Sequence, residues 1–303
     1  MKKLFHILET TQFERGWLEK DFFPLVDEMK ETVKSKKIIT DMAGKIMIDI
    51  FYASSLQTKF AAETAMKRLG GETITIEKTK LPLKEVIEGA LTANPDVIAL
   101  RYNQEGGAKK AAEISPVPII NFGEEYGDHP LQALTDSYTI LKRRGKIDGA
   151  TVAIAGELTR IGAARALIRL LENFSEVKVS LAYPSTIRFE KDIAELKKRG
   201  MLDKETADFK DIISEADIIY QVPLAPQRLA NPYFGLNGAS LNGFNVSPEM
   251  LSLAKKDAII MDPLPSHREK PLPELDADPR SVYLEQAENS LYVCMAILKI
   301  ILS

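Results

Sequence analysis

The chain has 303 residues, enough for two domains that each bury a core, and its 45% hydrophobic and 27% charged residues are typical of globular proteins. The formal net charge of −3 argues against a general nucleic-acid-binding protein, which would carry a basic excess. No apolar run approaches the ~18 residues that a membrane-spanning helix needs. We therefore expect neither nucleic acid nor a membrane as a partner.

Short β-rich runs alternate with longer helical stretches along the chain. A capping box at Thr11–Glu14 predicts an opening helix over roughly residues 12–33. The predicted strands are Lys45–Phe51, Thr73–Glu77, Asp96–Arg101, Val117–Phe122, Thr151–Gly156, Lys178–Tyr183, Asp217–Val222 and Ala258–Asp262. The predicted helices between them are Lys59–Leu69, Leu83–Thr92, Leu131–Arg144, Gly162–Asn173 and Phe189–Arg199. This alternation predicts an α/β fold with two doubly wound parallel-sheet domains.

The charged, glycine-containing run KRRGKIDGA marks the sharpest boundary between the two predicted domains. We place the first domain at residues 1–142 and the second at residues 149–285. The last helix, within residues 286–303, is apolar nearly all round and is therefore expected to be buried, packing back on the first domain.

Cysteine and histidine usage suggests a cytoplasmic protein without a metal. The single cysteine, Cys294, excludes an intrachain disulfide and suits a reducing compartment, and its apolar surroundings predict a buried small hydrophobe. The start of the chain lacks a small-residue cleavage site, so we expect no signal peptide. Three histidines without clustered Cys/His pairs indicate no metal site, and we expect no cofactor.

The turn that follows the first predicted strand has the character of an anion site. Backbone N–H groups and the positive end of the helix dipole favour an anion at such a turn. Ser55 and Thr58 add hydroxyl donors there. Serine and threonine are also the preferred helix caps, so a purely structural role is the alternative.

A second candidate is the segment His129-Pro130-Leu131-Gln132. Proline is favourable in the first turn of a helix, which puts His129 just before a helix N-terminus. That position disfavours protonation, so the neutral imidazole can donate a hydrogen bond to a carbonyl oxygen and stabilise developing negative charge. The alternative is an ordinary cap residue. Arg101 ends a buried strand, where pairing with a carboxylate is the alternative to a binding role.

These segments resemble the aspartate/ornithine carbamoyltransferase family, in the same order and over nearly the whole chain. The resemblance lies in FYASSLQTKFAAETAMKRLGG (Phe51–Gly71), GDHPLQALTDSYTI (Gly127–Ile140), PLP (Pro263–Pro265) and QAENSLYV (Gln286–Val293). The ornithine signature His-Cys-Leu-Pro is absent, so the chain is more similar to the aspartate branch.

The resemblance implies a site for carbamoyl phosphate in the first domain. His129 and Gln132 would hold the carbamoyl group, and Arg101 would contact both its oxygen and the phosphate. The loop after the last strand would offer backbone carbonyls to the carbamoyl NH₂. The matching positions are Ser55, Gln57, Thr58, Arg101, His129, Gln132, Pro263 and Leu264.

Several charges expected of the family are missing. Gln57 replaces an arginine of the turn, Gly162 stands at the position of an arginine that binds aspartate, and Pro223–Pro226 replaces the segment Arg-x-Gln. Removing one partner of a buried charge pair typically costs ~2–5 kcal/mol. The cations that could compensate in acceptor binding are Arg160, Arg228, Lys78 and Lys80.

Two hypotheses follow from this pattern. The first is a carbamoyltransferase of the aspartate type, acting on carbamoyl phosphate and on aspartate or a related small amine. The second is an inactive paralogue that acts as a structural or regulatory subunit beside another pyrimidine-pathway protein. The resemblance also implies a homotrimer with sites between subunits. A dinucleotide-binding protein is a weak third hypothesis, because the spacing from Gly156 to Gly162 lacks Gly-x-Gly-x-x-Gly.

Overall fold

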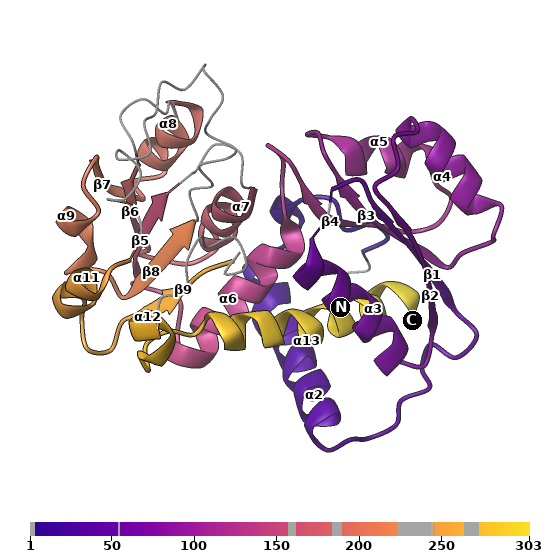
Figure 1. Ribbon diagram of the computed structural model, residues 1–303, viewed down its shortest axis with the longest axis horizontal. Helices are drawn as coiled ribbons and strands as arrows, with labels where there is room; N and C mark the ends of the chain where they lie inside the picture. Colours follow the sequence, from indigo (N-terminus) through magenta and orange to yellow (C-terminus); the bar gives the residue numbers. More distant parts are fainter. Residues whose placement is uncertain are drawn as a thin grey trace. The chain divides into compact units, whose positions relative to one another are not determined.

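The structure is a computed structural model. It describes residues 4–53, 55–156, 162–183, 190–222, 244, 246–263 and 273–303, with the backbone alone for residues 190–192. The chain divides into two compact units, which Figure 1 shows in the colours of the sequence. The first unit is Met1–Tyr138 with Ala287–Ser303, and the second is Thr139–Gln286. The domain ranges 1–142 and 149–285 stay a prediction.

The first unit contains a four-stranded parallel sheet with the order β2-β1-β3-β4. Its strands are β1 (Ile46–Phe51), β2 (Glu72–Glu77), β3 (Val97–Tyr102) and β4 (Ile119–Glu124). Its helices include α3 (Leu56–Arg68), α4 (Leu83–Leu91) and α5 (Gly107–Ile114). The helices α4 and α5 cover one face of the sheet (Figure 1). Their aliphatic side chains belong to the same buried cluster as Ile48 and Ile50 of β1. Covered strands of this kind are nearly continuous hydrophobic runs, which is why the sequence revealed them.

The second unit contains a five-stranded parallel sheet with the order β7-β6-β5-β8-β9. Its strands are β5 (Thr151–Gly156), β6 (Lys178–Ala182), β7 (Leu202–Thr206), β8 (Ile218–Val222) and β9 (Ile259–Met261). Its helices are α7 (Gly162–Leu171), α8 (Glu190–Lys198), α9 (Lys210–Ile213), α11 (Pro248–Leu253) and α12 (Pro273–Ala277). The last three of these pack on one face of the sheet. The prediction of two parallel-sheet domains is confirmed.

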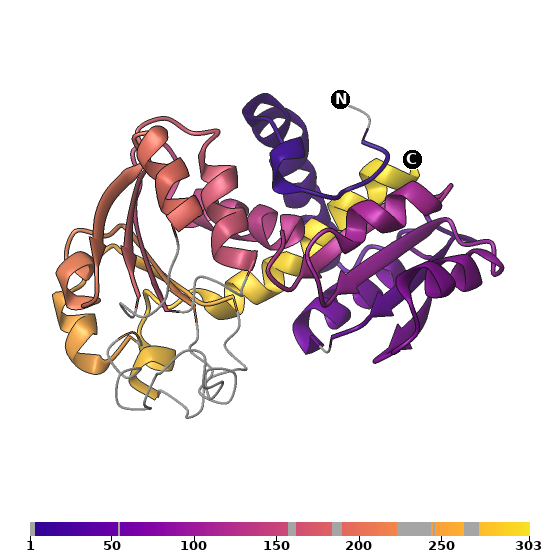
Figure 2. The same cartoon turned by 90° about the horizontal axis from the view of Figure 1, so that it is seen from above.

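Two long helices belong partly to each unit: α6 (Pro130–Arg144) and α13 (Tyr283–Leu302). From Ala287 onward α13 belongs to the first unit, which confirms that the last helix packs on that part of the chain (Figure 2). Its polar anchors reach α2 (Phe23–Lys34): Lys30 Nζ lies 3.4 Å from Asn289 Oδ1, and Lys299 Nζ lies 3.2 Å from Glu28. Cys294 is buried within α13.

The opening helix predicted over residues 12–33 is wrong at its start. The chain forms η1 (Thr10–Gln12), α1 (Arg15–Trp17) and the π-helical η2 (Leu18–Phe22) before α2. Gln12 Oε1 accepts hydrogen bonds from the N–H groups of Leu8 and Glu9, so the capping interaction begins at Glu9 and not at Thr11. The tertiary reason is that the preceding residues pair with β4, with Ile7 bridged to Ile120, which delays the helix.

A carboxyl group is buried in the middle of β1. Asp49 is fully buried, and among the described residues neither of its oxygens has a hydrogen-bond partner. Thr75, opposite it on β2, donates its hydroxyl to Glu63. Burial raises the pKa of Asp49 to about 8, with a contribution from the charge of Glu63, while Lys59 and Lys67 act against this shift.

Candidate active site

The candidate site lies at the carboxyl edge of the first sheet. After β1 the chain continues to β2 on one side of the sheet, and after β3 it continues to β4 on the other side. The strand order therefore reverses between the neighbouring strands β1 and β3. Open α/β sheets bind ligands outside such a reversal point. The turn before α3 follows β1 there, and Arg101 stands near the end of β3.

The turn before α3 presents hydroxyl and N–H donors. α3 begins at Leu56, ahead of the predicted start, so Gln57 and Thr58 lie in its first turn. Ser55 has an extended backbone, and its Oγ lies 2.8 Å from Thr58 Oγ1. The first N–H groups of a helix have no acceptor within the helix, so they are available to an anion. Gln57 is half-buried and adds a neutral amide instead of a cation.

The nearest cation on α3 is held by carboxylates. Lys59 Nζ lies 2.9 Å from Glu77 Oε1 and 3.7 Å from Glu63 Oε1. These contacts tie the lysine to the end of β2 and to its own helix. The turn therefore relies on hydroxyl groups, backbone N–H groups and the helix dipole more than on a free cation.

Arg101 and His129 come together beside this turn. Arg101 Nη1 donates to the carbonyl oxygen of Phe122 over 3.0 Å and lies 3.4 Å from His129 Nε2. The approach requires Gly123, whose φ is +112°. A Cβ atom there would lie 2.6 Å from Arg101 Nη1 and 2.7 Å from the His129 ring. The sequence predicted both side chains, but the glycine that lets them meet was missed.

His129 is a neutral hydrogen-bond donor in this arrangement. The Gln132 N–H lies 3.4 Å from His129 Nδ1, which favours the ring proton on Nε2, whereas the contact of Nε2 with the Arg101 guanidinium favours it on Nδ1. Burial, reinforced by the positive charge of Arg101, lowers the pKa of His129 to about 3. In the tautomer with the proton on Nε2, His129 Nε2–H and Arg101 Nη1–H stand side by side and can share one oxygen acceptor.

Gln132 is fixed by its own helix. Its Nε2 donates to Asp136 Oδ1 over 2.8 Å, so the other end of the amide, Oε1, is the acceptor end. An oriented amide acceptor on the helix that follows His129 suits a ligand with an NH₂ group, as an amide or a carbamoyl group has.

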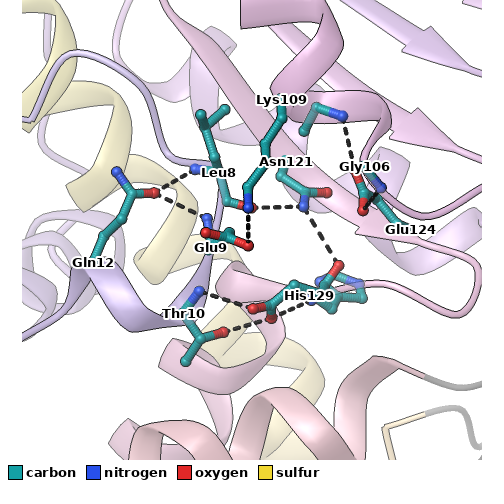
Figure 3. Close-up of polar contacts among 11 residues, drawn as sticks. Leu8, Glu9, Thr10, Gln12, Gly106, Lys109, Asn121, Glu124 and His129 are labelled. Atoms are coloured by element: carbon teal, nitrogen blue, oxygen red, sulfur yellow. Dashed lines mark hydrogen bonds and ion pairs between the residues drawn. The ribbon is translucent and has the colours of Figure 1, made fainter.

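A polar network, drawn in Figure 3, connects this site with the N-terminal segment. Asp128 accepts hydrogen bonds from the N–H of His129 and from Thr10. Asn121 Nδ2 donates to the carbonyl oxygen of Leu8 over 2.9 Å. Glu124 accepts from the N–H groups at the start of α5, Gly106 at 2.8 Å and Ala108 at 2.7 Å. The sequence analysis missed these three residues, because they contact segments distant in the chain.

The second-unit residues of the prediction fall largely outside the described parts. Arg160, Arg228 and Leu264 lie outside the described residues, as do Pro223–Pro226. Pro263 is described; it is buried just after β9.

Gly162 and Gly156 mark the reversal point of the second sheet. Gly162 is the first residue of α7. Gly156 ends β5 beside β8, and a Cβ atom on it would lie 1.8 Å from the carbonyl oxygen of Val222. The two strands therefore approach closely just where a second ligand crevice is expected.

Lys78 and Lys80 follow β2, at the carboxyl edge of the first sheet. Both are exposed, between β2 and α4. Lys78 has a φ of 53°, and its N–H donates to the carbonyl oxygen of Phe51 over 2.8 Å. Their place on the surface allows contact with an external partner.

The residues that the structure describes contain neither a candidate membrane span nor a candidate metal cluster. Over these ranges no helix combines the length and the apolar character needed to span a bilayer. Within the same residues, no three His, Cys, Asp or Glu side chains form a group that could hold a metal ion.

Comparison with known proteins places the chain in a family. Residues 6–142 match the family model "Aspartate/ornithine carbamoyltransferase, carbamoyl-P binding domain", and residues 148–301 match "Aspartate/ornithine carbamoyltransferase, Asp/Orn binding domain". The chloroplastic aspartate carbamoyltransferase of Arabidopsis thaliana is 34% identical over 99% of this chain and 78% of the relative. The aspartate carbamoyltransferase catalytic subunit of Methanocaldococcus jannaschii is 33% identical over 93% of this chain and 94% of the relative.

Solved structures agree with this assignment. Aspartate transcarbamoylase from Trypanosoma cruzi, in complex with carbamoyl phosphate and aspartate, superimposes with a TM-score of 0.87 at 25% identity. The match covers 98% of this chain and 97% of that chain. The resemblance seen in the sequence is confirmed: the chain belongs to the aspartate/ornithine carbamoyltransferase family.

Proposed function

We propose that this protein is a carbamoyltransferase of the aspartate type, which transfers the carbamoyl group of carbamoyl phosphate to the amine of aspartate or a related small acceptor. The observation that carries the proposal is the pair of donors, Arg101 Nη1 and His129 Nε2, 3.4 Å apart beside the α3 turn. Relatives with this name and a solved relative holding both substrates support it.

The chemistry needs positioned donors more than a covalent intermediate. The acceptor nitrogen attacks the carbamoyl carbon, a C–N bond forms and the C–O bond to phosphate breaks. The proton that the amine loses passes to the departing phosphate. Negative charge develops on the carbamoyl oxygen and on the leaving phosphate. His129 and Arg101 stabilise the first, while Arg101 and the donors of the α3 turn stabilise the second.

The neutrality of His129 is part of this proposal. Its pKa of about 3 keeps the ring a donor without charge at any pH near neutral. A neutral donor strengthens its hydrogen bond as the oxyanion forms, without requiring a protonation step. Gln132 Oε1 accepts a hydrogen bond from the carbamoyl NH₂ in the same scheme.

Gln57 stands where the family has an arginine, so we expect a single subunit to bind the dianionic substrate weakly. We propose that the protein acts as a homotrimer in the cytoplasm and that Lys78 or Lys80 of a neighbouring copy completes the positive surroundings of the phosphate. Both lysines are exposed, as this role requires. For the acceptor, Arg160 and Arg228 are the cations we propose, and a partner from pyrimidine biosynthesis is a further expectation.

The test is a steady-state assay with carbamoyl phosphate and a panel of amines, beginning with L-aspartate, on the full chain. We expect turnover with at least one amine and saturation by carbamoyl phosphate. Calorimetry with carbamoyl phosphate and with inorganic phosphate separates the two hypotheses. Absence of both turnover and binding heat would overturn the enzyme and favour the inactive paralogue.

A further inference from the structure

Asp128 connects His129 to a segment far away in the sequence. Its Oδ1 accepts a hydrogen bond from the His129 N–H at 2.7 Å and from the Thr10 hydroxyl at 2.6 Å. Its Oδ2 accepts from the Thr10 N–H at 3.0 Å. Asp128 is 4% exposed and Thr10 is 1% exposed. A buried carboxylate with three donors forms strong charge-assisted bonds with a fixed geometry.

The segment that carries Thr10 is itself held in place by β4. The Ile7 N–H donates to the carbonyl oxygen of Ile119 at 2.9 Å, and the Asn121 N–H donates to the carbonyl oxygen of Ile7 at 2.7 Å. Asn121 Nδ2 reaches the carbonyl oxygens of Leu8 and Asp128 (Figure 3). Thr10 is therefore a rigid support for Asp128 and not a mobile end of the chain.

An ordinary capping role does not account for this pattern. A capping side chain usually accepts from the second or third N–H of the helix. Asp128 accepts instead from the residue just before α6, which is His129, and from Thr10, 118 residues away in sequence. The bond to the His129 N–H restrains the backbone from which the imidazole projects toward Arg101.

We infer that Thr10 and Asp128 are positioning residues, which hold His129 at the orientation that places its Nε2–H beside Arg101. The inference rests on the proposed function for its consequence in catalysis, but the orientation of the ring can be measured without turnover. Neither residue contacts the reacting atoms in this account. They act through the backbone of His129 alone.

Thr10→Val tests the inference, because valine keeps the shape of threonine and removes the hydroxyl. We expect kcat to fall about tenfold with the KM for carbamoyl phosphate within about twofold of wild type, as for a hydrogen bond that matters only for orientation. Thr10→Ser restores the hydroxyl and should recover most of the rate. The matched control is Thr11→Val, the same change at the next, exposed residue.

The second readout is nuclear magnetic resonance of histidine-labelled full-length protein. The chain has three histidines, so the ring signals of His129 can be assigned by comparison with His129→Gln. We expect the wild type to show one neutral Nε2–H tautomer, Thr10→Val to shift or split these signals, and Thr10→Ser and Thr11→Val to keep them.

The two readouts separate the inference from the proposed function. Altered ring signals in Thr10→Val support the positioning role even if the wild type turns over no substrate, in which case only the proposed function fails. Unchanged signals and an unchanged kcat in Thr10→Val overturn the positioning role while the enzyme stands. If Thr10→Val does not fold, Asp128→Asn, which keeps one acceptor oxygen, gives the same two measurements.

Discussion

Asp49 of the first unit and Asp217 of the second are carboxyl groups in two similar sheets, but their surroundings differ. Asp49 lies inside β1 with no hydrogen-bond partner among the described residues, and burial raises its pKa. Asp217 lies just before β8 and receives Lys255 Nζ at 2.8 Å and Arg144 Nη2 at 2.9 Å. Burial alone would raise the pKa of Asp217, but the hydrogen bonds from Lys255 and the Thr151 N–H, with the charge of Arg144, lower it.

The two carboxyl groups therefore contribute to the pH dependence of stability in opposite directions. A carboxyl group with a raised pKa, such as Asp49, binds more protons in the folded state than in the unfolded state, so it destabilises the fold increasingly as pH rises. A carboxyl group with a lowered pKa stabilises the fold above its unfolded pKa, and this contribution is lost as pH falls.

Asp49→Asn should stabilise the first unit at alkaline pH. The folded pKa of about 8, against 3.8 in an unfolded chain, means that ionisation penalises the fold increasingly between these values. At about 1.4 kcal/mol per pH unit, the penalty approaches an upper limit of about 6 kcal/mol above pH 8, and asparagine removes it. Hydrogen exchange of the β1 amides at about pH 5 and about pH 8 measures it.

The control for this change is Asp257→Asn, at an exposed position of the second unit. It should leave the exchange of β1 unchanged at both values of pH. Equal exchange of β1 in wild type and Asp49→Asn at the alkaline value would show that Asp49 is not protonated in the fold.

His129→Ala should lower kcat by about 10²–10³, as expected for the loss of one donor to a developing oxyanion. The loss should be the same for every acceptor amine, because the first unit acts on the carbamoyl group. Steady-state kinetics with two different amines checks this. His129→Gln keeps a neutral N–H donor and should retain more activity. A loss that depends on the amine would contradict the division of roles between the units.

Gln57→Arg should tighten the binding of inorganic phosphate about tenfold to a hundredfold, since a charge-assisted hydrogen bond contributes about 1.5–3 kcal/mol. Calorimetry measures the change. Ala93→Arg adds the same charge at an exposed position before β3, at the opposite edge of the sheet, and should have little effect. Equal affinity in wild type and Gln57→Arg would mean that the α3 turn does not contact phosphate.

Lys255→Met should destabilise the second unit at neutral pH by less than about 1 kcal/mol, because the lysine is partly exposed and solvent screens the pair. The difference should vanish below the folded pKa of Asp217, where the carboxyl group is protonated. Hydrogen exchange of the β8 amides follows it. Lys256→Met, at the exposed neighbouring position, is the control. A difference that persists in acid would assign the effect to packing.

Much of the fold was predictable because both sheets consist of covered strands with continuous apolar runs. The strand β7 was missed, because its sequence LDKET is mostly polar and exposed. The helix α5 was also missed, since its start is fixed by Glu124 from β4 and not by a local cap. Both errors arise where tertiary contacts override the local pattern.

The candidate site was predictable in its residue types but not in its geometry. The sequence motifs predicted His129 and Arg101 as hydrogen-bond donors, and the family resemblance implied their roles in binding the carbamoyl group. Their meeting depends on the positive φ of Gly123 and on Asp128 bound to Thr10, which no local spacing reveals. Arg160, Arg228 and Leu264 fall outside the described residues, so their roles stay predictions.

Because Cys294 is buried, the rate at which its thiol is alkylated reports how often the first unit opens. The side chain is 3% exposed, and burial together with the charge of Asp49 raises the pKa of its thiol. Maleimides react with exposed thiolates, so they should alkylate the folded chain very slowly. Because the sequence contains no other cysteine, each molecule that becomes labelled records one event in which α13 has separated from its neighbours.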